Sequence, residues 1–156
     1  MDTPLALEFA MTYRLKVRGP LLSHDGSAPS PLRRYWEMTE ATLEGPSLRA
    51  STPMTGIDWF TPLADGYGRP HVRLPFLSEE GALILLEYSG IVHASPAFVR
   101  AVEHDTATSW SDQYMRLTMN FETTSERYAW LGQSLFIARG RLLGSYRIEY
   151  EVYRVM

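Results

Sequence analysis

The chain of 156 residues contains no cysteine, which excludes disulfide bonds, thiol nucleophiles and cysteine-ligated zinc. Its four histidines are scattered, and no pair shows the H-x-H or H-x-x-x-H spacing of a metal site. The sequence also lacks G-x-S-x-G, G-x-G-x-x-G and P-loop motifs, which argues against an α/β-hydrolase nucleophile and against a nucleotide cofactor. We therefore predict a protein that uses neither a metal nor an organic cofactor.

Lysine, positive charge and long apolar runs are scarce as well. Lys16 is the only lysine, so any Schiff-base chemistry would have to use it. A formal net charge of −3 gives nucleic-acid binding no electrostatic support. The longest apolar run, Ala82–Leu86, is far too short to cross a bilayer, and Met1–Leu7 lacks the features of a signal peptide. We expect a cytoplasmic protein that binds neither nucleic acid nor membrane.

Alternation of apolar and polar residues dominates what is present. From Leu5 to Val17 every odd position is apolar or aromatic, which predicts a long half-buried strand. Ser95-Pro96 has the pattern of a helix start and predicts one short helix that ends near His104. Further strands are predicted at Arg33–Glu44, Ser47–Thr52, Gly56–Thr61, His71–Leu77, Ala82–His93, Tyr114–Glu122, Gln133–Arg139 and Tyr146–Val155.

This succession of strands predicts a single all-β domain spanning residues 1–156. We favour a closed antiparallel β-barrel of about eight to ten strands with one short helix over a sandwich, because pairing of the long first and last strands would remove two edges. Gly19–Pro31 and Pro62–Pro70 are predicted loops, since both are rich in turn-forming residues. The long strands and the apolar face from Met115 to Phe121 would also fit a homo-oligomer.

Two polar residues on short strands are candidates for a site. Asp58 stands beside Trp59, so their side chains point to opposite faces of the strand. Asp58 could be a general base or a hydrogen-bond anchor at a barrel mouth, or a turn or cap residue. Arg73 lies on the opposite face from Val72 and Leu74, where it could bind a carboxylate or a developing oxyanion, or form a surface salt bridge.

The predicted strand Tyr114–Glu122 has a polar face that includes Arg116 and Glu122. If this face points inward, both residues line a cavity; if it points to solvent, which we favour, they form a charged surface. Tyr128 and Trp130 stand two residues apart just before another strand. They could gate a pocket or close one end of a barrel, and we favour the second role.

These segments together resemble the domain-of-unknown-function family 3237, whose members are small bacterial and fungal proteins. The resemblance covers nearly the whole chain through the order and spacing of its parts. It includes Leu5–Val17, Leu43–Pro46, Gly56–Trp59, Arg73, Gly81–Ile84, Tyr88–Gly90, Tyr114–Arg116, Phe121–Thr123, Tyr128–Leu131 and Glu149–Tyr153. The resemblance implies a compact antiparallel β-barrel and no particular reaction.

The resemblance also implies which residues belong to a site. The family's recurring Asp-Trp corresponds to Asp58-Trp59, its strand arginine to Arg73 and its Phe-Glu to Phe121-Glu122, which implies that these polar side chains share a site. The chain departs from the family at His71, where an aspartate is usual, and this puts in doubt any mechanism that needs an acid there. A histidine could instead supply a base that titrates near neutral pH.

The sequence as a whole predicts an enzyme that acts on an aromatic or polyketide-like small molecule by cofactor-free acid/base chemistry, of the isomerase, cyclase, lyase or hydrolase type. Asp58 or Glu122 would be the general base, and the predicted arginines would hold a carboxylate or enolate. The predicted substrate-binding residues are Trp36, Trp59, His71, Tyr88, Arg116, Tyr128 and Trp130. One alternative is a non-catalytic binding or carrier protein for a hydrophobic small molecule; another is an interaction module whose interior is filled by side chains.

Overall fold

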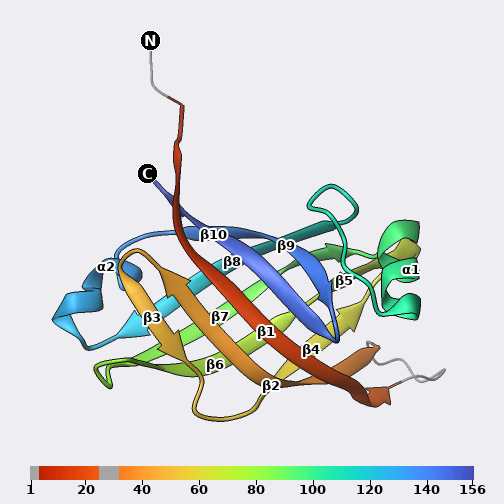
Figure 1. Ribbon diagram of the computed structural model, residues 1–156, viewed down its shortest axis with the longest axis horizontal. Coiled ribbons are helices and arrows are strands. Elements are labelled where there is room, and N and C mark those ends of the chain that lie inside the picture. Colours follow the sequence, from red (N-terminus) through yellow and green to blue (C-terminus); the bar gives the residue numbers. More distant parts are fainter. Residues whose placement is uncertain (1–3, 25–31) are drawn as a thin grey trace.

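The computed structural model describes residues 4–24 and 32–156, and ten strands dominate it (Figure 1). The strands are β1 (Leu7–His24), β2 (Arg33–Gly45), β3 (Leu48–Ser51), β4 (Gly56–Pro62), β5 (Tyr67–Arg69), β6 (His71–Ser78), β7 (Leu83–His93), β8 (Tyr114–Thr123), β9 (Phe136–Gly144) and β10 (Arg147–Val155). The same residues include helices α1 (Pro96–His104) and α2 (Ala129–Gly132) and the 3-10 turns η1 (Ala64–Gly66) and η2 (Glu126–Tyr128). The expected β architecture and number of strands are confirmed.

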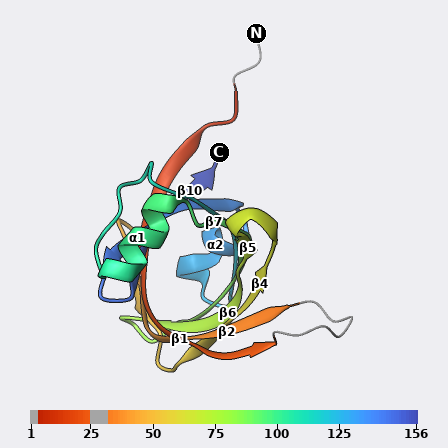
Figure 2. The ribbon, with the colours of Figure 1, turned by 90° about the vertical axis from the view of Figure 1, so that its right-hand side faces the viewer.

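The strands pair antiparallel and close into a ring. β1 pairs with β10 on one side and with β2 on the other, and the pairs β2–β4, β4–β6, β6–β7, β7–β8, β8–β9 and β9–β10 complete the circuit. The predicted pairing of the first and last strands is confirmed, with a register that runs from Leu7 opposite Val155 to Lys16 opposite Arg147. Figure 2 looks into this ring, with α1 beside its near end and α2 visible through it.

Helix α1 begins where the sequence predicts it. The Ser95 side chain accepts a hydrogen bond from the backbone N–H of Phe98, and Pro96 takes the first helical position. The helix ends at Asp105, whose backbone is left-handed with φ 53°. The prediction of a single helix is incomplete, because residues 129–132 form the second short helix, α2.

Both predicted loops contain strand residues. β1 continues through residues 19–24, because β2 pairs with it as far as Arg33 opposite His24. The rest of that predicted loop, residues 25–31, lies outside the described residues. Within the predicted loop Pro62–Pro70, the short strand β5 bridges β4 and β7. Its three residues are too few to produce a period-two signal in the sequence.

The apolar faces of β6 and β8 point into the ring. On β8, Met115, Leu117, Met119 and Phe121 are buried, while the alternating polar residues are exposed. This confirms the solvent-facing interpretation of the polar side of β8. It also removes the apolar β8 face as an argument for a homo-oligomer, because that face is part of the core.

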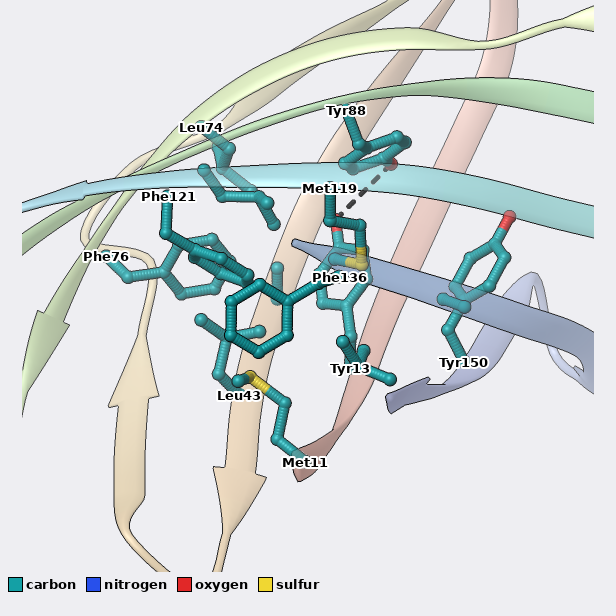
Figure 3. Close-up of a cluster of buried hydrophobic side chains, with 14 of the residues drawn as sticks. Met11, Tyr13, Leu43, Leu74, Phe76, Tyr88, Met119, Phe121, Phe136 and Tyr150 are labelled. Atoms are coloured by element: carbon teal, nitrogen blue, oxygen red, sulfur yellow. Dashed lines mark hydrogen bonds between the residues drawn. The ribbon is translucent and has the colours of Figure 1, made fainter. Parts of the chain in front are cut away.

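The core fills one end of the ring more completely than the other. Tyr13 lies between the two halves, since its ring contacts Phe76 edge-on at 6.2 Å and Tyr88 at 5.7 Å (Figure 3). On the α2 side, Phe121 packs on Phe136 with ring centroids 5.2 Å apart, and Leu131 of α2 is fully buried.

In the described part of the chain, no helix has both the length and the apolar character needed to cross a membrane.

Candidate functional site

A cavity of about 450 Å³ occupies the α1 end of the ring. Its size is within the range of small-molecule sites, which are usually apolar hollows with a few placed polar groups. The aromatic residues on its wall are Trp36, Phe60, Tyr67, Tyr88, Phe98, Tyr146 and Tyr150. The charged side chains that line it are Asp58, Arg34, Arg147 and Asp105. The cavity is therefore a mostly apolar space lined by aromatic side chains, with few charged groups.

Asp58 projects into this cavity from the middle of β4. Its neighbours Ile57 and Trp59 are exposed, so strand alternation turns the Asp58 side chain inward, opposite Trp36 of β2. The carboxylate accepts a hydrogen bond from the backbone N–H of His71, with the nitrogen 3.0 Å from Oδ1. The sequence prediction that Asp58 faces a pocket thus agrees with its position.

Burial shifts the acidity of this carboxyl group. Loss of hydration raises the pKa of Asp58 from 3.8 to about 7, although the hydrogen bond from the His71 N–H and the attraction of the His71 ring oppose the rise. A carboxyl group with such a pKa is present in both protonation states at neutral pH. This is the condition under which a general acid or base works best.

Three tyrosines stand close to Asp58 inside the ring. The hydroxyl oxygens of Tyr13 and Tyr88 are 3.4 Å apart (Figure 3). Tyr88 donates a hydrogen bond to the Met38 sulfur at 3.8 Å. Burial raises the pKa of Tyr13, Tyr88 and Tyr150, and the Asp58 charge raises all three further. These phenols therefore stay neutral at physiological pH. Tyr88 and Tyr150 both line the cavity, and the Tyr150 hydroxyl makes no side-chain hydrogen bond within the described residues, so it is available as a donor.

Three of the residues predicted from the sequence come together here. Asp58, Trp36 and Tyr88 all line the cavity. His71 reaches the site only through its backbone N–H, because its ring is on the outer surface, where Nε2 lies 3.1 Å from Glu87. His71 therefore positions the Asp58 carboxylate without presenting its own imidazole to the cavity.

The other predicted polar residues lie on the outside of the ring. Arg73 is exposed and pairs with Glu87 at 3.4 Å, since the neighbouring Val72 and Leu74 take the inner face of β6. Glu122 and Arg116 are on the exposed face of β8, and the Arg116 guanidinium lies over the Tyr114 ring at 4.8 Å. The expected shared site of Asp58, Arg73 and Glu122 does not form, because strand alternation sends the last two to solvent.

The aromatic residues Trp59, Tyr128 and Trp130 are also remote from the cavity. Trp59 packs against Tyr35 on the outer surface, with ring centroids 5.2 Å apart. The Tyr128 hydroxyl donates to Glu80 at 2.6 Å, and the Trp130 ring packs on Phe136 at 5.9 Å. Tyr128 and Trp130 belong to η2 and α2 at the filled end of the ring, as the plug interpretation expected.

Several cavity residues were not singled out from the sequence, and Arg34 is the most informative of them. Arg34, Trp36 and Met38 alternate along β2 and line the cavity together. Trp36 was a predicted binding residue, so the period of two placed Arg34 on the same face. Tyr150 and Phe98 gave no such signal, because their places depend on ring closure and on how α1 packs.

Metal binding has no support from the described geometry. Across residues 4–24 and 32–156, no three His, Cys, Asp or Glu side chains gather closely enough to hold a metal ion. Asp58 and Asp105 both border the cavity, but Asp105 accepts a hydrogen bond from the backbone N–H of Ser145. The polar chemistry that this cavity offers is therefore a carboxyl group, phenol hydroxyls and guanidinium groups.

Comparison with known proteins identifies the family of this fold. The sequence profile of the family described as "Protein of unknown function (DUF3237)" matches residues 5–155. The chain belongs to the DUF3237 family. No protein of curated function matches the chain.

Solved structures share the fold of this DUF3237 chain. A conserved protein of unknown function from Rhodopseudomonas palustris aligns with a TM-score of 0.85 and 20% identity over 100% of both chains. A β-barrel-like protein from Acinetobacter baumannii gives a TM-score of 0.81 and 25% identity over 100% of this chain and 99% of its own. A structure described as an enzyme from Penicillium herquei gives a TM-score of 0.68 and 22% identity over 100% and 98%.

Proposed function

We propose that this DUF3237 protein is a cofactor-independent acid/base enzyme for an aromatic or polyketide-like small molecule, with Asp58 as its general base. The observation that supports this most is a carboxyl group whose pKa is raised to about 7 and which opens into an apolar, ring-lined cavity. In this proposal the ring of strands acts as a closed β-barrel that holds the substrate, in a protein that works in the cytoplasm.

The proposed first step is removal of a proton from the bound substrate. An Asp58 oxygen takes the proton from an acidic C–H or O–H bond, and the electron pair of that bond stays on the substrate. The neutral Tyr150 hydroxyl then donates a hydrogen bond to the oxygen on which the negative charge develops. Return of the proton at another atom gives isomerisation, attack within the molecule gives cyclisation, and loss of a leaving group gives elimination.

A relative with the same fold supports a catalytic role. The Penicillium herquei protein is described as an enzyme, and its fold covers the whole of this chain. At 22% identity, this likeness supports catalysis on the fold without specifying a reaction. The assignment of Asp58 therefore depends on the geometry of this chain.

Exchange of hydrogen for deuterium tests the assignment without knowledge of the natural substrate. We would incubate 1-indanone, an enolisable aromatic ketone, with the protein in D₂O and follow loss of the α-proton signal by NMR. The wild-type protein should accelerate exchange, and the rate should rise with pH through about 7 as Asp58 ionises. Asp58→Asn should abolish the acceleration, because the amide cannot accept the proton as a base.

Arg116→Met is the matched control, since Arg116 is on the outer face of β8. This variant should exchange at the wild-type rate. Undiminished exchange by a folded Asp58→Asn variant would contradict the proposed role of Asp58.

The cavity also favours one second candidate, a carrier of a hydrophobic molecule. A ring-lined volume of about 450 Å³ with few polar groups would serve a carrier equally well. The carrier function predicts that 1-indanone binds in calorimetry but exchanges no faster than it does in buffer alone. The same pair of measurements therefore separates the two functions.

A further inference from the structure

We propose that the substrate of this cavity is an aromatic carboxylate and that the Arg34 guanidinium binds its carboxylate group. The inference depends on the proposed function in that it takes the Asp58 cavity to be the substrate site. It adds the charge of the substrate and the residue that recognises this charge.

Two arginines line the cavity, and their surroundings differ. Arg147 is already engaged, because its Nη2 lies 3.3 Å from an oxygen of Glu40. Arg34 has no carboxylate partner among residues 4–24 and 32–156, although its side chain borders the cavity. Arg34 is an exposed guanidinium at the edge of an apolar space, and within the described residues its planar donor fork pairs with no carboxylate. Such a group is suited to a planar carboxylate.

The strand register places Arg34 close enough to Asp58 for one ligand to contact both side chains. Arg34 lies opposite Phe60, and Trp36 lies opposite Asp58, so Arg34 and Asp58 are diagonal neighbours on the inner face of β2 and β4. Diagonal positions of an antiparallel pair have side-chain origins roughly 7 Å apart, which long side chains can span. A ligand anchored at Arg34 therefore keeps its ring within reach of the Asp58 carboxyl group.

Aromatic side chains flank these two polar groups on the cavity wall. Trp36 is the β2 residue next to Arg34 on the inner face, and Phe60 is next to Asp58 on β4. They offer ring faces to an aromatic ligand whose charged end reaches Arg34 at the start of β2. The other negative group at the cavity, Asp105, is held by its hydrogen bond with the Ser145 N–H. The arrangement fits a ligand with a flat apolar body and one anionic end.

A pair of compounds that differ only in charge tests this proposal. We would measure binding of 2-naphthoate and of the neutral 2-naphthamide by isothermal titration calorimetry at about pH 6, where Asp58 is mostly protonated and repels an anion least. The wild-type protein should prefer naphthoate by about tenfold, the gain expected from a charge-assisted hydrogen-bond pair. Arg34→Met should remove this preference while naphthamide affinity stays within about twofold.

Two further variants sharpen the result. Arg34→Lys keeps the charge but loses the planar fork, so it should retain only part of the preference. Arg116→Met removes an exposed arginine from the outer face of β8 and should keep the full preference. Wild-type protein that binds both compounds equally or binds neither, or a folded Arg34→Met variant that keeps the preference, would overturn the proposal.

Failure of this inference differs from failure of the proposed function. If the naphthoate preference is absent while 1-indanone exchange still depends on Asp58, only the substrate class is wrong. If Asp58→Asn leaves exchange unchanged while the preference still depends on Arg34, the cavity binds aromatic carboxylates but Asp58 is not its base. Asp58→Asn should itself retain the naphthoate preference, because Arg34 is unaltered.

Discussion

At the residue scale, the direction of the Asp58 side chain follows from its own strand, whereas its pKa depends on residues of other elements. Alternation around Ile57 and Trp59 places its side chain on the inner face of β4. Its raised pKa depends instead on burial against the cavity wall, which outweighs the lowering effect of the hydrogen bond from the His71 backbone N–H on β6. A carboxyl group held in this way makes the folded protein sensitive to pH.

The stability of the protein should report this ionisation. Because the folded pKa of Asp58, about 7, is higher than the value of 3.8 it has when hydrated, the folded state binds the proton more tightly. This contribution to stability is fully present below about pH 4 and is lost as the pH rises towards about 7. The full shift corresponds to roughly 4 kcal/mol, and partial exposure of Asp58 reduces our expectation to about 2 kcal/mol.

Urea unfolding of the wild-type protein and of Asp58→Asn at about pH 4 and about pH 8 measures this effect. Asparagine accepts the same hydrogen bond from His71 but carries no titrating group. The variant should therefore gain about 2 kcal/mol relative to wild type between the two pH values. A difference that does not change with pH would show that Asp58 titrates as an exposed carboxyl group.

At the element scale, the first and last strands close the ring through more than their backbone pairing. Glu149 of β10 is buried on the outer face and accepts hydrogen bonds from two arginines, Arg14 of β1 at 2.7 Å and Arg141 of β9 at 2.8 Å. Trp110 covers this group, with its ring 4.5 Å from the Arg141 guanidinium. One carboxylate therefore ties together the three strands at the point where the chain closes on itself.

Glu149→Gln should weaken this closure. The amide removes the carboxylate that Arg141 pairs with and leaves Arg14 only its longer contact with Glu44 at 3.8 Å. We expect a loss of about 2 kcal/mol in the free energy of unfolding. Glu151→Gln is the control, because Glu151 bonds Arg139 at 2.7 Å in a more exposed position and should cost clearly less. If urea unfolding gives equal losses of unfolding free energy for the two variants, the contact of Glu149 with three strands stabilises the protein no more than an exposed ion pair does.

Sequence patterns predicted the elements better than they predicted the site. The period of two located nine strands, and the Ser95-Pro96 pair located α1. The same period puts Arg73 opposite the buried Val72 and Leu74, so its assignment to the site conflicted with its own strand pattern. Arg34 differs, because the same period of two correctly predicts that it shares the cavity face of β2 with Trp36. That it has no carboxylate partner among the described residues depends on the tertiary structure and could not be predicted from the strand pattern.

At the scale of the whole molecule, the two ends of the ring of strands differ: one is packed with side chains and the other holds the cavity. Phe136 is buried at the filled end, against Phe121 and Trp130, where side-chain contacts supply stability. Val92 of β7 borders the cavity at the other end. Which end is filled depends on where α1 and α2 pack, and no local pattern along a single strand carries that information.

This division of tasks predicts that one substitution at each end has opposite consequences. Phe136→Ala should lower the free energy of unfolding by about 3 kcal/mol, because it leaves a void among packed rings. Val92→Phe should change stability by less than about 1.5 kcal/mol, since the added ring enters existing space, and it should abolish 2-naphthoate binding in calorimetry.

Val99→Phe provides the control for the added ring, because Val99 is exposed on α1 and does not border the cavity. This variant should bind naphthoate as the wild type does. If Val92→Phe binds naphthoate normally, the ligand does not occupy the cavity, and the proposed roles of Asp58 and Arg34 both lose their basis. If Val92→Phe instead unfolds the protein, the α1 end is as tightly packed as the α2 end, and the division between a stabilising end and a binding end is wrong.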